Sequence, residues 1–451
     1  MASNAEWAQR DLSVLWHPCT QMKDHASWPP IPIRRASGVW LEDFDGHRYI
    51  DAISSWWVNL FGHGHPVINA ALKAQVDTLE HVLLAGFTHE PAIRLAETLI
   101  SKAPPGLSRC FYADNGSSAV EVALKMSYHA WRNQGCPEKT LFITLENSYH
   151  GETLGALAVG DVSLYRETYA PLLMRSIRVK SPDAYDREPG VSPADHARQI
   201  FKHMEATLAE HAWETAAVIV EPLVQCAGGM RMYDPIYLTL LREACDRHGV
   251  HLIADEIAVG FGRTGTLFAC EHAKITPDFL CLSKGLTGGY LPLSAVLTTS
   301  EIFDAFYDVY ASGKAFLHSH SYTGNALACS VALASLSLFD RDDVLASNNE
   351  KSRFMRSSVE ALENHPHVAE VRQQGMILAI EMVENAATRK PFPPEARRGL
   401  KVYHEALQHG VLLRPLGNVI YFMPPYTINT EELQQMAQAA IRGIHVATLE
   451  N

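Results

Sequence analysis

Residues 250–256 read VHLIADE, and residues 279–284 read FLCLSK. Each segment is a short apolar run of the kind that forms a buried strand in a parallel sheet, and each ends in ionisable side chains. Asp255 and Lys284 therefore follow the ends of two predicted strands. In open α/β sheets, ligands bind in the crevice outside the carboxyl ends of the strands. The two residues predict a ligand site at that edge of a sheet.

The middle of the chain alternates short β-prone runs with longer helical patterns, which predicts an α/β fold with a mostly parallel central sheet flanked by helices. A helix is expected over Ala119–Trp131, entered through the polar turn at residues 114–118. The predicted strands are Leu141–Leu145, Ala217–Val220, Val250–Ala254, Phe279–Leu282 and Ala295–Thr298.

A chain of 451 residues is too long for a single core, so two domains are expected. We place the large domain at residues 61–334. A smaller α/β domain would combine residues 1–60 with residues 335–451. Its predicted elements include a hairpin around Asp45-Gly46 and a terminal helix over Glu431–Ala447.

Composition excludes several classes of protein. The 38 Lys and Arg residues against 50 Asp and Glu give a net charge of −12, and no basic run could follow a phosphate backbone, so nucleic acid is not an expected partner. The eight cysteines are scattered without zinc spacing and are interpreted as reduced thiols. Neither a secretory signal nor a membrane-spanning apolar run is recognisable. We expect a cytoplasmic protein without a membrane partner.

Lys284 alone is a weak signal, because lysines often follow strands. The acidic pair Asp255-Glu256 is equally compatible with a metal site, a cap or the partner of a cofactor cation. The combination favours pyridoxal phosphate (PLP), since a lysine can bind its carbonyl carbon as a Schiff base while an aspartate holds its ring nitrogen protonated. Glu256 is interpreted as structural. We expect no metal, because further ligands at suitable spacing are missing nearby.

Two further segments suit such a cofactor. Gly116-Ser117-Ser118 precedes the predicted helix and offers N–H groups and hydroxyls to a phosphate, although the turn taken alone is more typical of an ordinary N-cap. Tyr149 follows another predicted strand, where its ring could stack on the cofactor or simply belong to the core. His63 and His65 lie among glycines before a proline, which is more typical of a tight loop than of a metal site.

Taken together, these segments resemble the class III aminotransferases of fold type I, which are PLP enzymes. The matches follow the order of the family and cover nearly the whole chain. They are Asp114-Asn115-Gly116-Ser117, Ser148-Tyr149-His150-Gly151, Val220-Glu221-Pro222, Asp255-Glu256-Ile257, Val259 to Gly265 (VGFGRTG) and Leu282-Ser283-Lys284-Gly285.

Other segments resemble the members of the class that act in biotin synthesis. This resemblance implies that S-adenosylmethionine donates an amino group to 8-amino-7-oxononanoate, giving 7,8-diaminononanoate. The segments are Leu15-Trp16-His17-Pro18, Ser54-Ser55-Trp56-Trp57, Ala227 to Arg231 (AGGMR), Leu286 to Tyr290 (LTGGY), Leu413-Arg414-Pro415 and Tyr421 to Tyr426 (YFMPPY).

The resemblance also implies roles for individual residues. Gly116 and Ser117 would hold the phosphate, Tyr149 would stack on the cofactor and meet the substrate, and Asp255 and Lys284 would act as described above. Arg414 would clamp the carboxylate of the oxo acid, with Glu221 as a carboxylate that can pair with it. The other implied substrate residues are Cys19, Trp56, Ser319 and Tyr421, and His320 and Ser321 would reach the phosphate from the second subunit of a homodimer.

The sequence departs from the pattern of its relatives at two places. Cys19 stands where several relatives have a tyrosine, and His318 to Ser321 (HSHS) replaces a His-Gly-Pro-Thr stretch. Lysine as amino donor, or another ω-aminotransferase reaction, therefore stays open. A decarboxylase or aminomutase of the same fold, or a cofactor-binding protein without activity, are more distant alternatives.

Overall fold

A seven-stranded sheet lies at the centre of the computed structural model, which describes residues 2–449. Its strands lie in the order β4-β12-β11-β10-β7-β5-β6. Strands β11, β10, β7, β5 and β6 pair in parallel, whereas β12 runs antiparallel to both β11 and β4. The mostly parallel sheet of the sequence prediction is confirmed. The bounds are β4 Leu107–Ala113, β5 Leu141–Leu145, β6 Ile177–Val179, β7 Thr215–Val220, β10 His251–Asp255, β11 Phe279–Leu282 and β12 Ser294–Thr299.

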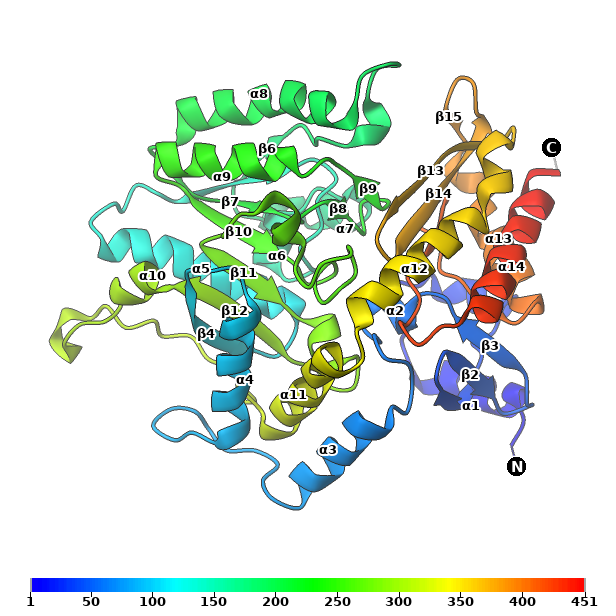
Figure 1. Ribbon diagram of the computed structural model, residues 1–451, viewed down its shortest axis with the longest axis horizontal. Helices are drawn as coiled ribbons and strands as arrows, with labels where there is room; N and C mark the ends of the chain where they lie inside the picture. The colour runs from blue at the N-terminus through cyan, green and yellow to red at the C-terminus, as the bar shows by residue number, and fades with distance from the viewer. Residues whose placement is uncertain (1, 450–451) are drawn as a thin grey trace.

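Helices cover both faces of this sheet (Figure 1). Helix α5 packs on one face, and α9 and α8 lie on the other. Successive residues of the inner strands belong to different cores: Ile253 packs with α5, and Leu252 belongs to the opposite layer. Both faces are therefore buried, which explains the uninterrupted apolar runs. The helices of this part are α3 Pro66–Val76, α4 Glu90–Lys102, α5 Gly116–Asn133, α6 Leu154–Ala158, α7 Ser163–Arg166, α8 Pro193–His211, α9 Ile236–His248, α10 Ser300–Asp304 and α11 Ala326–Arg341.

The two ends of the chain meet beside this unit, where the blue and red segments of Figure 1 lie together. Strand β16 pairs in parallel with β3, and β2 and β3 form the hairpin predicted around Asp45-Gly46. A second sheet joins β13, β14, β15 and β17. The bounds are α1 Asn4–Val14, β1 Ile33–Ser37, β2 Trp40–Asp43, β3 Arg48–Asp51, α2 Ser54–Trp57, β8 Val224–Gln225, β9 Arg231–Met232, α12 Val344–Ser357, β13 Val368–Gln374, β14 Ile377–Asn385, β15 Lys390–Pro391, α13 Arg398–Gln408, β16 Val411–Leu412, β17 Val419–Phe422 and α14 Thr430–Leu449.

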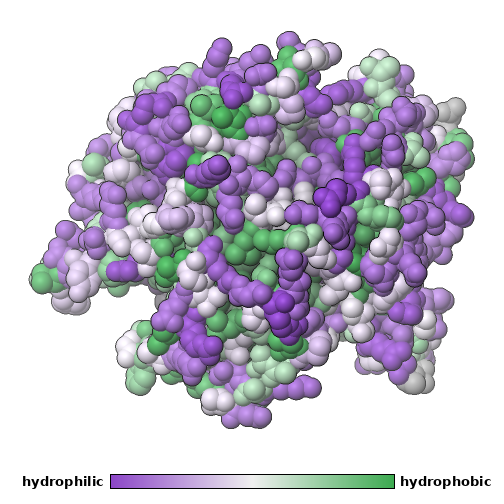
Figure 2. Space-filling view, in the orientation of Figure 1, coloured by the Kyte–Doolittle hydropathy of each residue, from purple (hydrophilic) through white to green (hydrophobic). Residues whose placement is uncertain are grey.

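The pairing of both ends is what the predicted smaller domain requires, and its boundaries at residues 60 and 335 stay predictions. Hydrophilic side chains spread over the face seen in Figure 2, between small hydrophobic patches. None of the helices within residues 2–449 combines the length and the apolar character needed to cross a bilayer.

The core makes a direct stability prediction. Leu252 is completely buried in β10, so Leu252→Ala should lower the free energy of unfolding by about 2–5 kcal/mol through the cavity it leaves. Leu164→Ala serves as the control, because Leu164 is 82% exposed. Chemical denaturation followed by circular dichroism compares the two, and equal midpoints would contradict this view of the core.

Candidate active site

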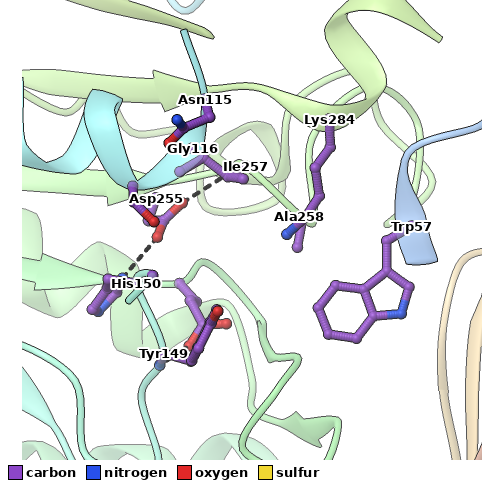
Figure 3. A pocket seen from close by; sticks show the side chains of 12 residues that line it. Trp57, Asn115, Gly116, Tyr149, His150, Asp255, Ile257, Ala258 and Lys284 are labelled. Carbon is purple, nitrogen blue, oxygen red and sulfur yellow. Dashed lines mark hydrogen bonds and ion pairs between the residues drawn. The ribbon is translucent and has the colours of Figure 1, made fainter. Parts of the chain in front are cut away.

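A cavity opens at the carboxyl ends of the central strands. It is bounded by Asp255, Tyr149, Lys284 and Trp57, whose side chains surround an open space in Figure 3. The residues that line it are Trp57, Asn115, Gly116, Ser117, Tyr149, His150, Gly151, Glu221, Asp255, Ile257, Ala258 and Lys284. Six of the residues given a role from the sequence are thus brought together, namely Gly116, Ser117, Tyr149, Glu221, Asp255 and Lys284.

Asp255 ends β10 and is fixed from two sides. One carboxylate oxygen lies 2.7 Å from Nδ1 of the buried His150, and the other accepts a 3.1 Å hydrogen bond from the N–H of Ile257. The neighbouring Glu256 instead accepts hydrogen bonds from the N–H groups of Ala269 and Cys270, at 2.6 and 2.8 Å. Asp255 is therefore a rigid carboxylate facing the cavity, and Glu256 is used internally.

Lys284 reaches the cavity from the residue pair that follows β11. Because Asp255 in β10 pairs with Cys281 in β11, the parallel register brings both functional side chains to one edge of the sheet. Burial lowers the pKa of the Lys284 amine, partly offset by Cys226, Asp255 and Glu221. Its Nζ lies 4.9 Å from the ring centroid of Trp57. A lowered pKa increases the fraction of the amine that is neutral and nucleophilic.

The opposite end of the cavity suits an anion. Gly116 and Ser117 are the first residues of α5, where backbone N–H groups have no acceptor within the helix and the helix dipole is positive. Asn115 caps the helix by accepting from the N–H of Ser118, at 3.1 Å. A Cβ added to Gly151 would lie 2.1 Å from Oγ of Ser117. Gly151 thus leaves room at the start of the helix. Residues 116–118, which the sequence analysis placed in a turn, are the first residues of α5.

Tyr149 belongs to a polar cluster at the mouth of the cavity. Its hydroxyl donates to Glu152 at 2.9 Å, and its ring meets Tyr165 edge-on at 5.5 Å. Cys19 lies at the same place, since its Sγ is 3.8 Å from the Glu152 carboxylate. Burial, followed by Glu152, raises the pKa of the Tyr149 phenol, so this hydroxyl stays protonated at neutral pH. Glu152 and Tyr165 had no role in the sequence interpretation.

Arg414 and the tandem tryptophans form the remaining side. The Arg414 guanidinium lies over the Trp56 ring, 3.7 Å from its centroid, and no carboxylate within residues 2–449 forms an ion pair with it. Trp57, not Trp56, lines the cavity, and its indole N–H donates to the hydroxyl of Tyr421 at 3.1 Å. The expected role of Trp56 in substrate binding stays a prediction.

The predicted pairing of Glu221 with Arg414 does not occur among the described residues. Glu221 is buried and accepts hydrogen bonds from the N–H groups of Tyr149 and Cys226, at 2.9 and 3.0 Å. These two backbone groups occupy both carboxylate oxygens. Burial is the main cause that raises the pKa of Glu221 to about 7, while His150 acts in the opposite direction.

Ser319, His320 and Ser321 do not line this cavity. His320 contacts His318 through their Nε2 atoms at 3.2 Å, and its Nδ1 lies 3.6 Å from Asp114. Their predicted place at the phosphate of a second subunit concerns an assembly of two chains, so it stays a prediction.

The chain is similar to known proteins over most of its length. The family model of the class-III aminotransferases matches residues 21–444. The chain belongs to the class III aminotransferase family. It is 48% identical over 435 residues to an adenosylmethionine-8-amino-7-oxononanoate aminotransferase from Helicobacter pylori, covering 95% of each chain.

Solved structures agree with this assignment. The crystal structure of an adenosylmethionine-8-amino-7-oxononanoate aminotransferase from Methanocaldococcus jannaschii matches with a TM-score of 0.92 at 36% identity, over 98% of both chains. An omega transaminase from Pseudomonas jessenii, solved in complex with PMP, matches with a TM-score of 0.93 at 28% identity, also over 98% of both chains. The predicted fold type I architecture of a class III aminotransferase is confirmed.

Glu221 makes the stability of the protein depend on pH. Its pKa rises from 4.5 to about 7 on folding, so its stabilising contribution is complete below pH 4.5 and is lost as the pH rises through about 7. Between these pH values, the wild type should lose about 3 kcal/mol relative to Glu221→Gln. Urea denaturation across this range measures the difference. For Glu138→Gln, at an exposed position, the free energy of unfolding should change with pH as it does in the wild type. The same pH dependence in Glu221→Gln and the wild type would contradict the raised pKa.

Proposed function

We propose that the protein is a PLP-dependent aminotransferase that transfers an amino group from S-adenosylmethionine to 8-amino-7-oxononanoate, giving 7,8-diaminononanoate for biotin synthesis. The main support is one arrangement. The buried amine of Lys284 and the fixed carboxylate of Asp255 line the same cavity, and helix α5 begins at its other end. The close relatives named above carry out this reaction according to their names.

The cavity fits PLP at three points. The N–H groups at the start of α5, with Ser117, would hold the phosphate, and Asp255 would pair with the ring nitrogen. Lys284 would bind the carbonyl carbon, and the ring would lie against Tyr149. When bound, PLP withdraws electrons from the carbon that carries the substrate amine, so that its proton becomes acidic.

Residues of the chain then supply proton transfer and positioning. Lys284 would act as the general base that takes the proton from the substrate α-carbon and then, once protonated, as the general acid that gives this proton up again, so that its amine ends the reaction unchanged. Its lowered pKa suits both steps. Asp255 would face the ring nitrogen of the cofactor, and the hydrogen bond with Nδ1 of His150 fixes the direction of its carboxylate.

Arg414 is the proposed anchor for the carboxylate of the oxo acid. The face of its guanidinium rests on Trp56, so the N–H groups at its edge can make the two parallel hydrogen bonds that a carboxylate accepts. Cys19, Tyr149 and Tyr421 are further candidates for substrate contacts.

We further propose a cytoplasmic homodimer, in which Ser319, His320 and Ser321 complete the site of the other subunit. The eight cysteines are free, which supports a reducing compartment. Structural similarity to the omega transaminase keeps a simple ω-amine as an alternative donor. Lysine is the second alternative donor.

Half-reactions test the donor. S-adenosylmethionine should bleach the visible absorbance band of the lysine-bound cofactor, and 8-amino-7-oxononanoate should restore it. Bleaching by lysine alone would keep the acceptor and change the donor. If a simple ω-amine bleaches the band and neither of these donors does, the biotin assignment falls.

Lys284→Ala should lose transfer completely, since the proton carrier is gone, and normal turnover by this variant would refute the role of Lys284.

Arg414 separates carboxylate recognition from chemistry. Arg414→Ala should raise KM for 8-amino-7-oxononanoate about tenfold to hundredfold, the loss expected for charged hydrogen bonds. The KM of Arg414→Lys should lie between those of the wild type and Arg414→Ala, because lysine keeps the charge without the two-donor fork. Steady-state kinetics with varied acceptor measure both, and an unchanged KM in Arg414→Ala would place the carboxylate elsewhere.

A further inference from the structure

The tandem tryptophans lie in an unusual backbone segment. Ser54, Ser55, Trp56 and Trp57 all have positive φ, at 50°, 41°, 73° and 74°. With ψ values of 48° and 57°, Ser55 and Trp56 have the backbone conformation of a left-handed helix, and the whole segment is one turn long. This conformation brings Cβ too close to the following carbonyl oxygen and is disfavoured for residues other than glycine. Four successive residues keep it only where the surroundings impose it.

Asp51, at the end of β3, holds the first half of this turn. One carboxylate oxygen accepts from the Ser55 N–H and the other from the Ser55 hydroxyl, both at 2.7 Å. His63 approaches the second oxygen with Nε2 at 3.0 Å, and its Nδ1 is 3.1 Å from the side-chain amide of Asn59. The Asp51 side chain is completely buried. A single carboxylate thus binds the turn and the loop that follows it.

Arg263 supports the turn from the other side. It donates to Oγ of Ser54 at 3.0 Å and to the carbonyl of Pro424 at 2.7 Å, and Ser54 itself donates to the carbonyl of Met423 at 2.7 Å. Arg263 is only 1% exposed. The turn is therefore attached to the segment that follows β17.

The left-handed turn sends the two indole rings to different ends of the site. Trp57 faces Nζ of Lys284 and donates to Tyr421, whereas Trp56 lies under Arg414. Neighbouring residues of a strand point to opposite faces, and those of a right-handed helix are about 100° apart. The two rings are placed here by neither pattern.

We propose that Asp51 is a positioning residue: by holding Ser54 to Trp57 in the left-handed turn, it aims Trp57 at the lysine and Trp56 at the arginine. One buried carboxylate then sets both the proton-transfer end and the carboxylate-binding end of the site. This inference rests on the proposed function for its effect on turnover, but the geometry of the turn is independent of it.

Hydrogen exchange tests the turn without any reaction. In the protein as purified, without substrate, Asp51→Ala should accelerate exchange at least tenfold in the peptide covering residues 51–60, because the N–H groups of Ser55, Trp57 and Val58 all take part in this turn. Asp77→Ala, at an exposed position after α3, is the matched control and should leave this peptide unchanged. Unchanged exchange in Asp51→Ala would overturn the proposal whatever the enzyme catalyses.

A pair of substitutions at Ser55 tests the effect on turnover. Ser55→Ala and Ser55→Gly both lose the hydroxyl that binds Asp51, but glycine adopts positive φ without the steric cost. Ser55→Gly should therefore keep about threefold to fivefold more kcat/KM than Ser55→Ala, with kcat and KM both affected. The same order is expected in the Asp51→Ala background, where glycine should restore part of the lost activity.

If a double variant with Asp51→Ala does not fold, kcat/KM of Ser55→Ala and Ser55→Gly is compared in the wild-type background alone. Equal activity of Ser55→Ala and Ser55→Gly would overturn the proposal. Absence of amino transfer in the wild type itself would instead remove the proposed function and leave the exchange result valid.

Discussion

The parallel pairing of β10 with β11 is the constraint on which the site depends. It sets Ile253 opposite Phe279 and Asp255 opposite Cys281. Asp255, at the end of β10, and Lys284, just after β11, therefore leave the sheet at the same edge. Any shift by one residue would turn Asp255 to the other layer and Glu256 toward the cavity, since side chains alternate along a strand. Burial of both faces by apolar residues makes this register costly to change. The chemistry of the site is therefore protected by the packing of the core.

Several buried polar side chains around the cavity form hydrogen bonds with the backbone. Glu256 and Glu221 each accept two N–H groups, and Arg263 donates to carbonyl oxygens as well as to Ser54. Such bonds tie loops from distant parts of the sequence to the ends of the strands, and they leave Lys284 and Arg414 available for ligands. Removing one partner would leave a buried group unpaired, which is more costly than the net value of the bond itself.

The sequence was most informative where burial leaves one simple pattern. The strands Leu141–Leu145 and Phe279–Leu282 were predicted to the residue, because they are buried throughout and apolar apart from Thr144. Strands β4 and β6 were missed: they form the edges of the sheet, and β4 carries the polar sequence LSRCFYA. Among site residues, the strand ends identified Asp255 and Lys284. No periodic pattern distinguishes Trp57 from Trp56 in a left-handed turn, and the ties of His150 to Asp255 and of Asp51 to Ser55 depend on contacts that spacing alone does not reveal.

The bond between Trp57 and Tyr421 joins residues 364 positions apart. During synthesis, the large sheet and both Asp255 and Lys284 leave the ribosome well before β17 exists. The turn that carries Trp57 therefore stays without this support until the last part of the chain has been made. A chain truncated before residue 421 would contain Asp255 and Lys284 but would lack both Tyr421 and the segment to which Arg263 attaches the turn.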